Sequence, residues 1–157
     1  MKKISIAILA ISLLVIASCK KETKVSGGSW AFKGTTYDVK SGIPSSSDNT
    51  LVLVSSGSNT YNQLLFSFYT LPPADGSYTV VQGAPDTTGT QVGVSMTLTT
   101  GATYNGPTYL PVSSPSATVT VVNGRIKVSL PSTDMMNATD STDVSALTAT
   151  VNQTVDY

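Results

Sequence analysis

The sequence has no histidine, one cysteine and one glutamate, and charged residues make up only 11% of its 157 positions. The absence of histidine excludes Ser-His-Asp and Cys-His nucleophilic sites and histidine general bases. It also excludes nearly all known types of zinc site. A single cysteine excludes an intrachain disulfide. The chain also lacks a glycine-rich phosphate loop and a dinucleotide fingerprint. These absences predict a protein that needs no cofactor.

Aspartates remain as candidates for acid–base catalysis, as in the carboxylate pair of a glycosidase. Asp48, Asp75 and Asp86 lie in turn-like segments, where aspartate is favoured because it bonds to nearby backbone groups. Asp38 falls on the polar face of an expected hairpin. Because structural roles explain all four carboxylates, we expect that the protein is not an enzyme.

The single cysteine, Cys19, follows a segment with the layout of a secretory signal peptide. Met1–Lys3 is positively charged, and Ile4–Ile16 is a 13-residue run without a charge. That run is too short for a membrane-spanning helix, which needs about 20 apolar residues. An ordinary signal peptide with a chance cysteine is one interpretation of this pattern.

The stretch "IASC" at positions 16–19 resembles the lipobox of bacterial lipoproteins: a branched aliphatic residue, two small residues and a cysteine. In that family the cysteine sulfur receives a diacylglyceryl group, the signal peptide is cut before it, and the new amine is usually acylated, with palmitate as a typical chain. The resemblance implies a signal peptide over residues 1–18 and lipidation of Cys19. Since each buried methylene contributes about 0.8 kcal/mol, two or three acyl chains would hold the protein durably at a membrane.

Residues 19–28 are the expected lipidated tether, followed by a domain over residues 29–157. The stretch from Lys20 to Gly28 spans at most roughly 30 Å, so the domain is expected close to its membrane. Position 20 is lysine, whereas aspartate there resembles an inner-membrane retention signal of lipoproteins. We therefore expect the outer membrane as the location, facing either the periplasm or the outside.

The nine basic and nine acidic residues are unevenly distributed. From Ser26 onwards the chain has four basic and eight acidic side chains, which gives the domain a net charge near −4. It carries no basic stripe, so nucleic acid is not an expected partner. Lys20, Lys21 and Lys24 make the tether positive, which suits anionic lipid headgroups, although a solvated spacer has the same composition.

The strongest structural signal is the Asn123–Gly124 pair, which favours a two-residue type I′ hairpin turn. Counting outward from this turn places Val121 opposite Ile126 and Val119 opposite Val128. One face of the expected hairpin is then apolar and the other polar.

A second hairpin is expected in "SWAFKGTTYDV", with Gly34–Thr35 as a type II′ turn. This register pairs Trp30 with Val39. It also places Phe32 and Tyr37 on the same inward face.

Alternation of apolar residues indicates further short strands separated by Gly, Pro and Asn turns. Leu64–Leu71 is apolar on both sides and is typical of a central strand. No convincing helix is present, although residues 134–143 leave room for one helical turn. We therefore expect an all-β domain, an antiparallel Ig-like β-sandwich of about nine strands. The alternative is a lipocalin-like β-barrel, prompted by the G-x-W pattern at residues 28–30.

The order of lipobox, "SWAFKGTTYDV", "LPPADGSYTV", "SATVTVVNGRIKVSLP" and "ALTATVNQ" resembles small single-domain lipoproteins common in Bacteroidetes. The resemblance covers most of the mature chain. Because its motifs are turns and strand faces, it implies a fold and a location but no catalytic residue.

Two loop features are candidate binding sites. Residues 134–143 supply hard oxygen ligands, which calcium prefers. The spacing of these ligands is not that of an EF-hand, so we predict a solvated acidic loop and no metal site. Tyr104 and Tyr109 flank the "NGPT" turn, and Tyr61 falls in another expected loop; tyrosine joins an apolar face to a polar tip. Tyr104 and Tyr109 are therefore the candidate ligand contacts, with packing over a sandwich edge as the alternative. The possible calcium ligands are Asp134, Asn137, Asp140 and Asp143.

These observations predict a membrane-anchored, noncatalytic lipoprotein with a structural or protein-interaction role at the bacterial cell envelope. It would contact another protein through a sheet edge or a loop surface. The alternative is a glycan- or small-ligand-binding module that uses loop aromatics.

Overall fold

The computed structural model describes residues 27–57, 60–99 and 106–154 of the chain. This part of the chain contains eleven strands and no helix, which confirms the all-β prediction with two strands more than expected. The strands are β1 (Gly27–Phe32), β2 (Thr35–Asp38), β3 (Ser41–Ser45), β4 (Thr50–Gly57), β5 (Thr60–Ser67), β6 (Gly76–Val81), β7 (Gln91–Thr97), β8 (Thr108–Pro111), β9 (Ser116–Val122), β10 (Arg125–Asn137) and β11 (Asp140–Thr154).

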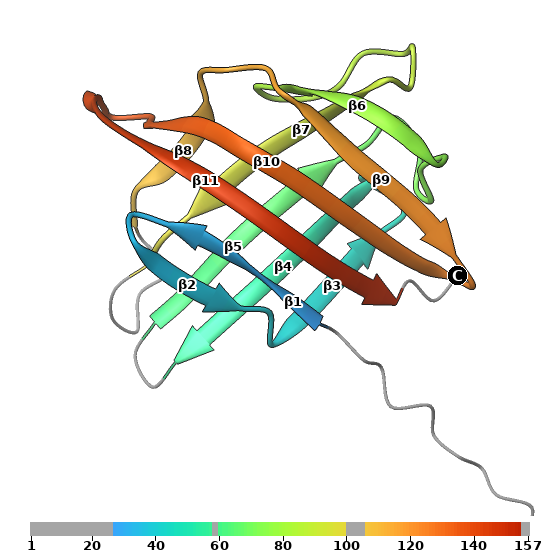
Figure 1. Ribbon diagram of the computed structural model, residues 1–157, viewed down its shortest axis with the longest axis horizontal. Coiled ribbons are helices and arrows are strands. Elements are labelled where there is room, and N and C mark those ends of the chain that lie inside the picture. Colours follow the sequence, from blue (N-terminus) through green and yellow to red (C-terminus); the bar gives the residue numbers. More distant parts are fainter. Residues whose placement is uncertain (1–26, 58–59, 100–105, 155–157) are drawn as a thin grey trace, which may run out of the picture.

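All eleven strands belong to one sheet, in the order β2-β1-β11-β10-β9-β6-β7-β5-β4-β3, with β8 paired to β10 and β7. The neighbours pair antiparallel except β6 and β7, which are parallel. Figure 1 shows β1, β11, β10 and β9 as one layer that crosses the strands β3, β4 and β5 behind it. Crossed layers within one continuous sheet occur in orthogonal sandwiches and in barrels. The structure therefore combines features of both expected architectures.

The segment 35–45 joins the two ends of the sheet by changing its partner halfway. Its first half, β2, pairs with β1, and its second half, β3, pairs with β4. Between them, the Val39 amide donates to the Gly28 carbonyl at 3.0 Å, and the Lys40 amide donates to the Val54 carbonyl at 2.8 Å. Consecutive residues thus link the ends of the sheet.

The first hairpin turns at Lys33–Gly34, one residue earlier than the expected Gly34–Thr35. The φ angles of Lys33 and Gly34 are 49° and 73°, which is the left-handed pair of a type I′ turn. Trp30 consequently pairs with Tyr37 instead of Val39, so the predicted register was wrong. The predicted face is confirmed, because a partner shift of two positions keeps the same side chains inward.

The second hairpin has the predicted register. Asn123 and Gly124 have φ angles of 52° and 72°, and the strand pairs extend from Val122 opposite Arg125 to Thr118 opposite Ser129. Turn chemistry alone was sufficient to predict this element.

Residues 134–143, where one helical turn was allowed, instead form the β10–β11 hairpin. β10 continues to Asn137 and β11 begins at Asp140, and the two strands make the most extensive pairing in the sheet. The register shifts between Leu130 and Thr133, next to Pro131. Beyond this irregularity β10 leaves β9 and pairs with β8, so the strand bends from one layer toward the other.

The core lies between the crossed layers and is built from the predicted strand faces. β5 lies between β4 and β7, which confirms its central position. Alternating residues on β7 and β11 are buried, namely Val92, Val94 and Met96, and Leu147, Ala149 and Val151. The largest fully buried side chains are Trp30, Phe32, Phe66, Leu51, Leu53, Leu64, Met96, Ile126, Met135, Leu147, Val80 and Val92.

Candidate functional site

The candidate ligand contacts expected from the sequence do not form a surface platform in the described structure. Tyr104 lies outside the described residues, as does Cys19. Tyr109 lies on β8 and is only 3% exposed, so its expected exposure in a loop was wrong. Its ring packs edge-on against Phe32, with ring centroids 4.7 Å apart. Tyr61 lies on β5 instead of in a loop.

The hydroxyl of Tyr109 belongs to a polar cluster with Lys33 and Asp143. Lys33 Nζ donates to Tyr109 Oη at 2.9 Å, and Tyr109 in turn donates to Asp143 Oδ2 at 2.8 Å. Lys33 Nζ also forms an ion pair with Asp143 Oδ1 at 2.6 Å, and Asn137 Nδ2 approaches Asp143 at 3.4 Å. The cluster joins the β1–β2 turn, β8 and the β10–β11 hairpin.

Each charge in this cluster stabilises the other. The hydrogen bond from the Lys33 ammonium is the main reason why the pKa of Asp143 lies below its ordinary value. The hydrogen bond from the Tyr109 hydroxyl is the second. The carboxylate of Asp143, followed by Tyr109, raises the pKa of Lys33. At neutral pH the lysine is therefore protonated and the aspartate ionised, and each contacts the other and the Tyr109 hydroxyl. The arrangement fixes three elements together.

The acidic segment 134–143 is also spread over structural contacts. Asp143 faces Lys33, whereas Asp140 accepts hydrogen bonds from the amide and hydroxyl of Thr142. Asn137 accepts equivalent bonds from Thr139. Among the described residues, no group of three or more Asp, Glu, His or Cys side chains is arranged to hold a metal ion.

Asp86 makes the local backbone hydrogen bond that its turn position predicted, whereas Asp48 and Asp75 accept hydrogen bonds from other groups. Asp48 accepts from the Ser45 hydroxyl at 2.9 Å, and Asp86 accepts from the Thr88 amide at 3.0 Å. Asp75 accepts from the amide of Val121 on β9. These carboxylates stabilise turns and strand ends.

A groove opens where β2 and β4 diverge, and sequence reasoning did not anticipate it. We call it the seam groove; its volume is ≈ 440 Å³ and it is lined by Thr35, Tyr37, Ser55, Ser56, Gly57, Thr60, Asn62, Leu98 and Thr99. β3 pairs with β4 only as far as Val54, so the last residues of β4 pair with β5 alone. Tyr37 forms the aromatic wall and stacks on Trp30, with ring centroids 5.6 Å apart.

The corresponding gap on the other side of the segment 35–45 is closed by a side chain. Gln153 on β11 reaches Gly42 on β3, and its Nε2 donates to the Gly42 carbonyl at 3.4 Å. A Cβ at position 42 would collide with this side chain. One seam is therefore filled by a side chain of β11, whereas the described residues leave the seam groove at the other.

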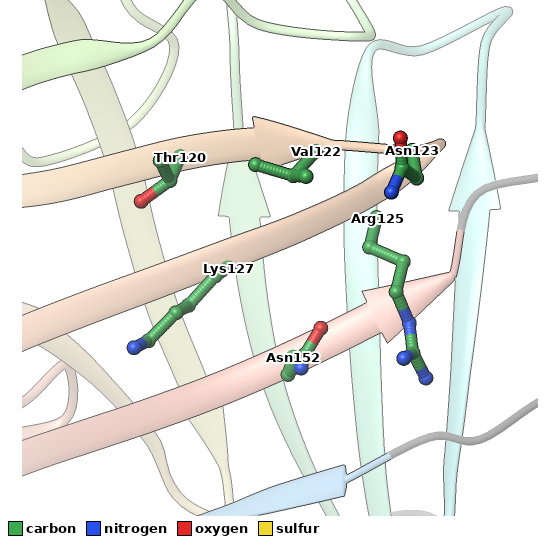
Figure 2. Close-up of a pocket in the computed structure, with 6 residues that line it drawn as sticks. All are labelled: Thr120, Val122, Asn123, Arg125, Lys127 and Asn152. Carbon is green, nitrogen blue, oxygen red and sulfur yellow. The ribbon is translucent and has the colours of Figure 1, made fainter.

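A second groove lies on the outward face of β9, β10 and β11. We call it the cationic groove; its volume is ≈ 440 Å³ and it is lined by Thr120, Val122, Asn123, Arg125, Lys127 and Asn152. Figure 2 shows Lys127 extending along the sheet and Arg125 reaching past the end of β11, with Asn152 between them. Amide, hydroxyl and cationic groups thus lie along one shallow surface.

No helix in the described residues is long and apolar enough to cross a membrane. In comparisons with known proteins, no family model, no curated protein and no solved structure matches this chain.

Proposed function

We propose that the protein is a membrane-anchored, noncatalytic lipoprotein of the bacterial outer membrane with a structural or protein-interaction role. The observation that carries the proposal is the lipobox-like "IASC" at residues 16–19, with the first strand starting only eight residues later, at Gly27. The short tether, at most roughly 30 Å long, would hold the β domain close to the envelope. The polar cluster of Lys33, Tyr109 and Asp143, fully engaged within itself, supports a noncatalytic role.

The seam groove is the surface that suits a protein partner best. An extended segment that enters between β2 and β4 would pair with strand edges on both sides, which is the strand-addition mode of peptide recognition. Phe32 and Thr35 flank the two-residue turn as a hydrogen-bonded pair, so the next pair, Ala31 and Thr36, is not hydrogen-bonded. The amide and carbonyl groups of Thr36 therefore point away from β1, toward this groove. Tyr37 would contact every second side chain of the added strand.

A proline at Thr36 tests this mode of binding. Thr36→Pro removes the amide that faces the groove, while it leaves the β1–β2 hydrogen bonds of the neighbouring residues. Thr36→Val is the matched control, because it keeps the amide and the β-branched shape. With a photocrosslinking residue at Ser56, we expect a discrete adduct with an envelope protein in wild type and Thr36→Val, and its loss in Thr36→Pro.

A crosslinker at Thr118 on β9 controls for position. An adduct that survives Thr36→Pro, or that forms equally from Thr118, would contradict strand addition at the seam groove.

The second candidate function is binding of a glycan or another small ligand in the same groove. The specific observation is the half-buried ring of Tyr37 beside the exposed hydroxyl residues Thr35, Ser56 and Thr60. This is the combination of a flat apolar face and polar groups that sugars prefer. A soluble sugar at 100 times its dissociation constant would stabilise the fold by about 2.7 kcal/mol. A thermal-shift screen of wild type and Tyr37→Ala tests this; a sugar that shifts both proteins equally would exclude the groove.

A further inference from the structure

The geometry points to a second contact with the membrane: the cationic groove docks on the anionic lipid headgroups of the same bilayer that holds Cys19. This inference rests on the proposed lipid anchor but concerns a different part of the molecule, the outward face of β9, β10 and β11. Docking at this face would give the domain a fixed orientation instead of leaving it free to rotate on its tether.

The cationic groove lies beside the point where the tether enters the fold. Gly27, the first described residue, is opposite Asn152 on β11, and Asn152 is opposite Lys127 on β10. Lys127 is in turn opposite Thr120 on β9. With neighbouring strands about 4.8 Å apart, Lys127 lies roughly 10 Å from Gly27.

The length of the tether brings this face within reach of the bilayer. Seven residues separate Cys19 from Gly27, and the eight steps from one Cα to the next span at most roughly 28 Å when fully extended. The three lysines of the tether, at positions 20, 21 and 24, favour an anionic surface and shorten this distance further. A cationic surface next to Gly27 therefore experiences a high local concentration of headgroups.

The distribution of charge also favours this face. The domain has only four basic residues, and two of them, Arg125 and Lys127, line the cationic groove. The domain as a whole is acidic, so a headgroup phosphate would be repelled by most other faces and attracted here.

The remaining groups of the groove fit a headgroup as well. Asn123 and Asn152 supply amide donors for phosphate oxygens, and Figure 2 shows both side chains on the same surface as Arg125 and Lys127. Val122 is an apolar side chain that is 57% exposed at the rim. An exposed aliphatic residue beside cations is suited to the boundary between headgroups and acyl chains.

The test measures how accessible Val122 is in the lipidated full-length protein reconstituted in vesicles. In Val122→Cys the new thiol is the reactive one, because acylation occupies Cys19, and its rate of reaction with an uncharged maleimide reports burial. Val144→Cys is the matched control, since Val144 is 47% exposed on β11 near the β10–β11 turn. Vesicles contain either phosphatidylcholine alone or phosphatidylcholine with phosphatidylglycerol.

We expect Val122→Cys to react about five-fold or more slowly in the anionic vesicles, and Val144→Cys to react equally in both. Adding Arg125→Gln and Lys127→Gln, or raising the salt to 1 M, should abolish the slowing, because each cation near an anionic surface contributes about a five-fold preference. The thermal midpoint of each variant confirms that it remains folded.

Equal rates in the two kinds of vesicle, or slowing that persists without the two cations, would overturn docking. The anchor is measured separately, by flotation with the vesicles and by the acyl mass on Cys19. A protein that floats and is acylated but shows no slowing disproves docking alone, whereas an unacylated Cys19 disproves the anchor and docking together.

Discussion

At the scale of single residues, Lys33 combines an uncommon backbone conformation with a set of side-chain contacts to distant residues. It adopts a left-handed backbone conformation with φ of 49° in the β1–β2 turn, which non-glycine residues adopt infrequently. Its ammonium group simultaneously contacts Asp143 and the ring of Tyr109, whose centroid is 4.9 Å away. The contacts at the end of the side chain thus offset the cost of the turn conformation and connect residues 110 positions apart.

Removal of the Tyr109 hydroxyl tests how much this cluster stabilises the fold. Tyr109→Phe keeps the packing against Phe32 but loses the hydrogen bonds to Lys33 and Asp143, so we expect the free energy of unfolding to fall by about 1 kcal/mol. Tyr69→Phe is the control, since Tyr69 is 47% exposed. Equal urea midpoints for the wild type and Tyr109→Phe would show that the cluster has no role in stability.

The ion pair predicts a specific pH dependence for Asp143→Asn. The pKa of Asp143 is lowered in the folded protein, chiefly by Lys33, so its stabilising contribution is fully present above the unfolded pKa of about 3.9 and is lost as the pH falls through the folded pKa. The pKa of Lys33 is raised, chiefly by Asp143, so its contribution is lost only as the pH rises through a value above 10.5.

We therefore expect wild type to be more stable than Asp143→Asn at pH 7, with the difference shrinking below pH 4 and above pH 11. Urea unfolding of both proteins across this range measures the difference directly. The pKa of Asp140 is also lowered, chiefly by Thr142, and this contribution of Thr142 is common to both proteins. A difference that stays constant from pH 7 to pH 3 would contradict the ion pair.

At the scale of elements, one glycine allows β7 to pack against the loop that follows β6. Gly93 is buried on β7, and a Cβ at this position would collide with the backbone carbonyl of Gly83. Because backbone must shift to make room, we expect Gly93→Ala to destabilise the fold by about 1–3 kcal/mol. Gly27→Ala, which places a Cβ in open space, should be nearly neutral in the same denaturation assay. If the two variants unfolded alike, the close approach of these two elements would be unimportant.

Elements governed by local chemistry were predictable from the sequence. Asn123–Gly124 set both the turn type and the register of its hairpin, because few residue pairs adopt two successive positive φ angles. The turn of the earlier hairpin was misplaced by one residue because glycine can occupy either central turn position. Nothing in the local pattern indicated a positive φ at Lys33. β3 was not predicted, because it contains Pro44 and proline is unfavourable inside a strand. Pro44 is tolerated there since β3 pairs with a neighbour on only one side.

At the scale of the whole molecule, the features that depend on distant segments were not predictable. Tyr109 is buried because β8 pairs with both β10 and β7, and no local pattern in a four-residue strand indicates such partners. The open seam exists because Val39 and Lys40 switch partners from β1 to β4. Alternation indicates which side chains face inward, but it does not indicate how the edges of a closed sheet meet.

The proposals for the two grooves and the tether fit one arrangement of the molecule. The tether enters the fold at Gly27, two strands away from Lys127 of the cationic groove, so both would face the bilayer. Figure 1 shows the β1–β2 turn and the end of β4 away from the point where the chain enters β1. In this arrangement the seam groove remains accessible to a partner in the envelope.

The most direct test of the central claim is the mass of the N-terminal peptide of the mature protein, isolated from the membrane fraction of its bacterial host. The account predicts a chain that begins at Cys19, lacks residues 1–18 and carries a diacylglyceryl group on sulfur and an acyl chain on the amine. Cys19→Ala should carry none of these groups. A mature chain that retains Met1, or that has a free thiol at Cys19, would contradict the account.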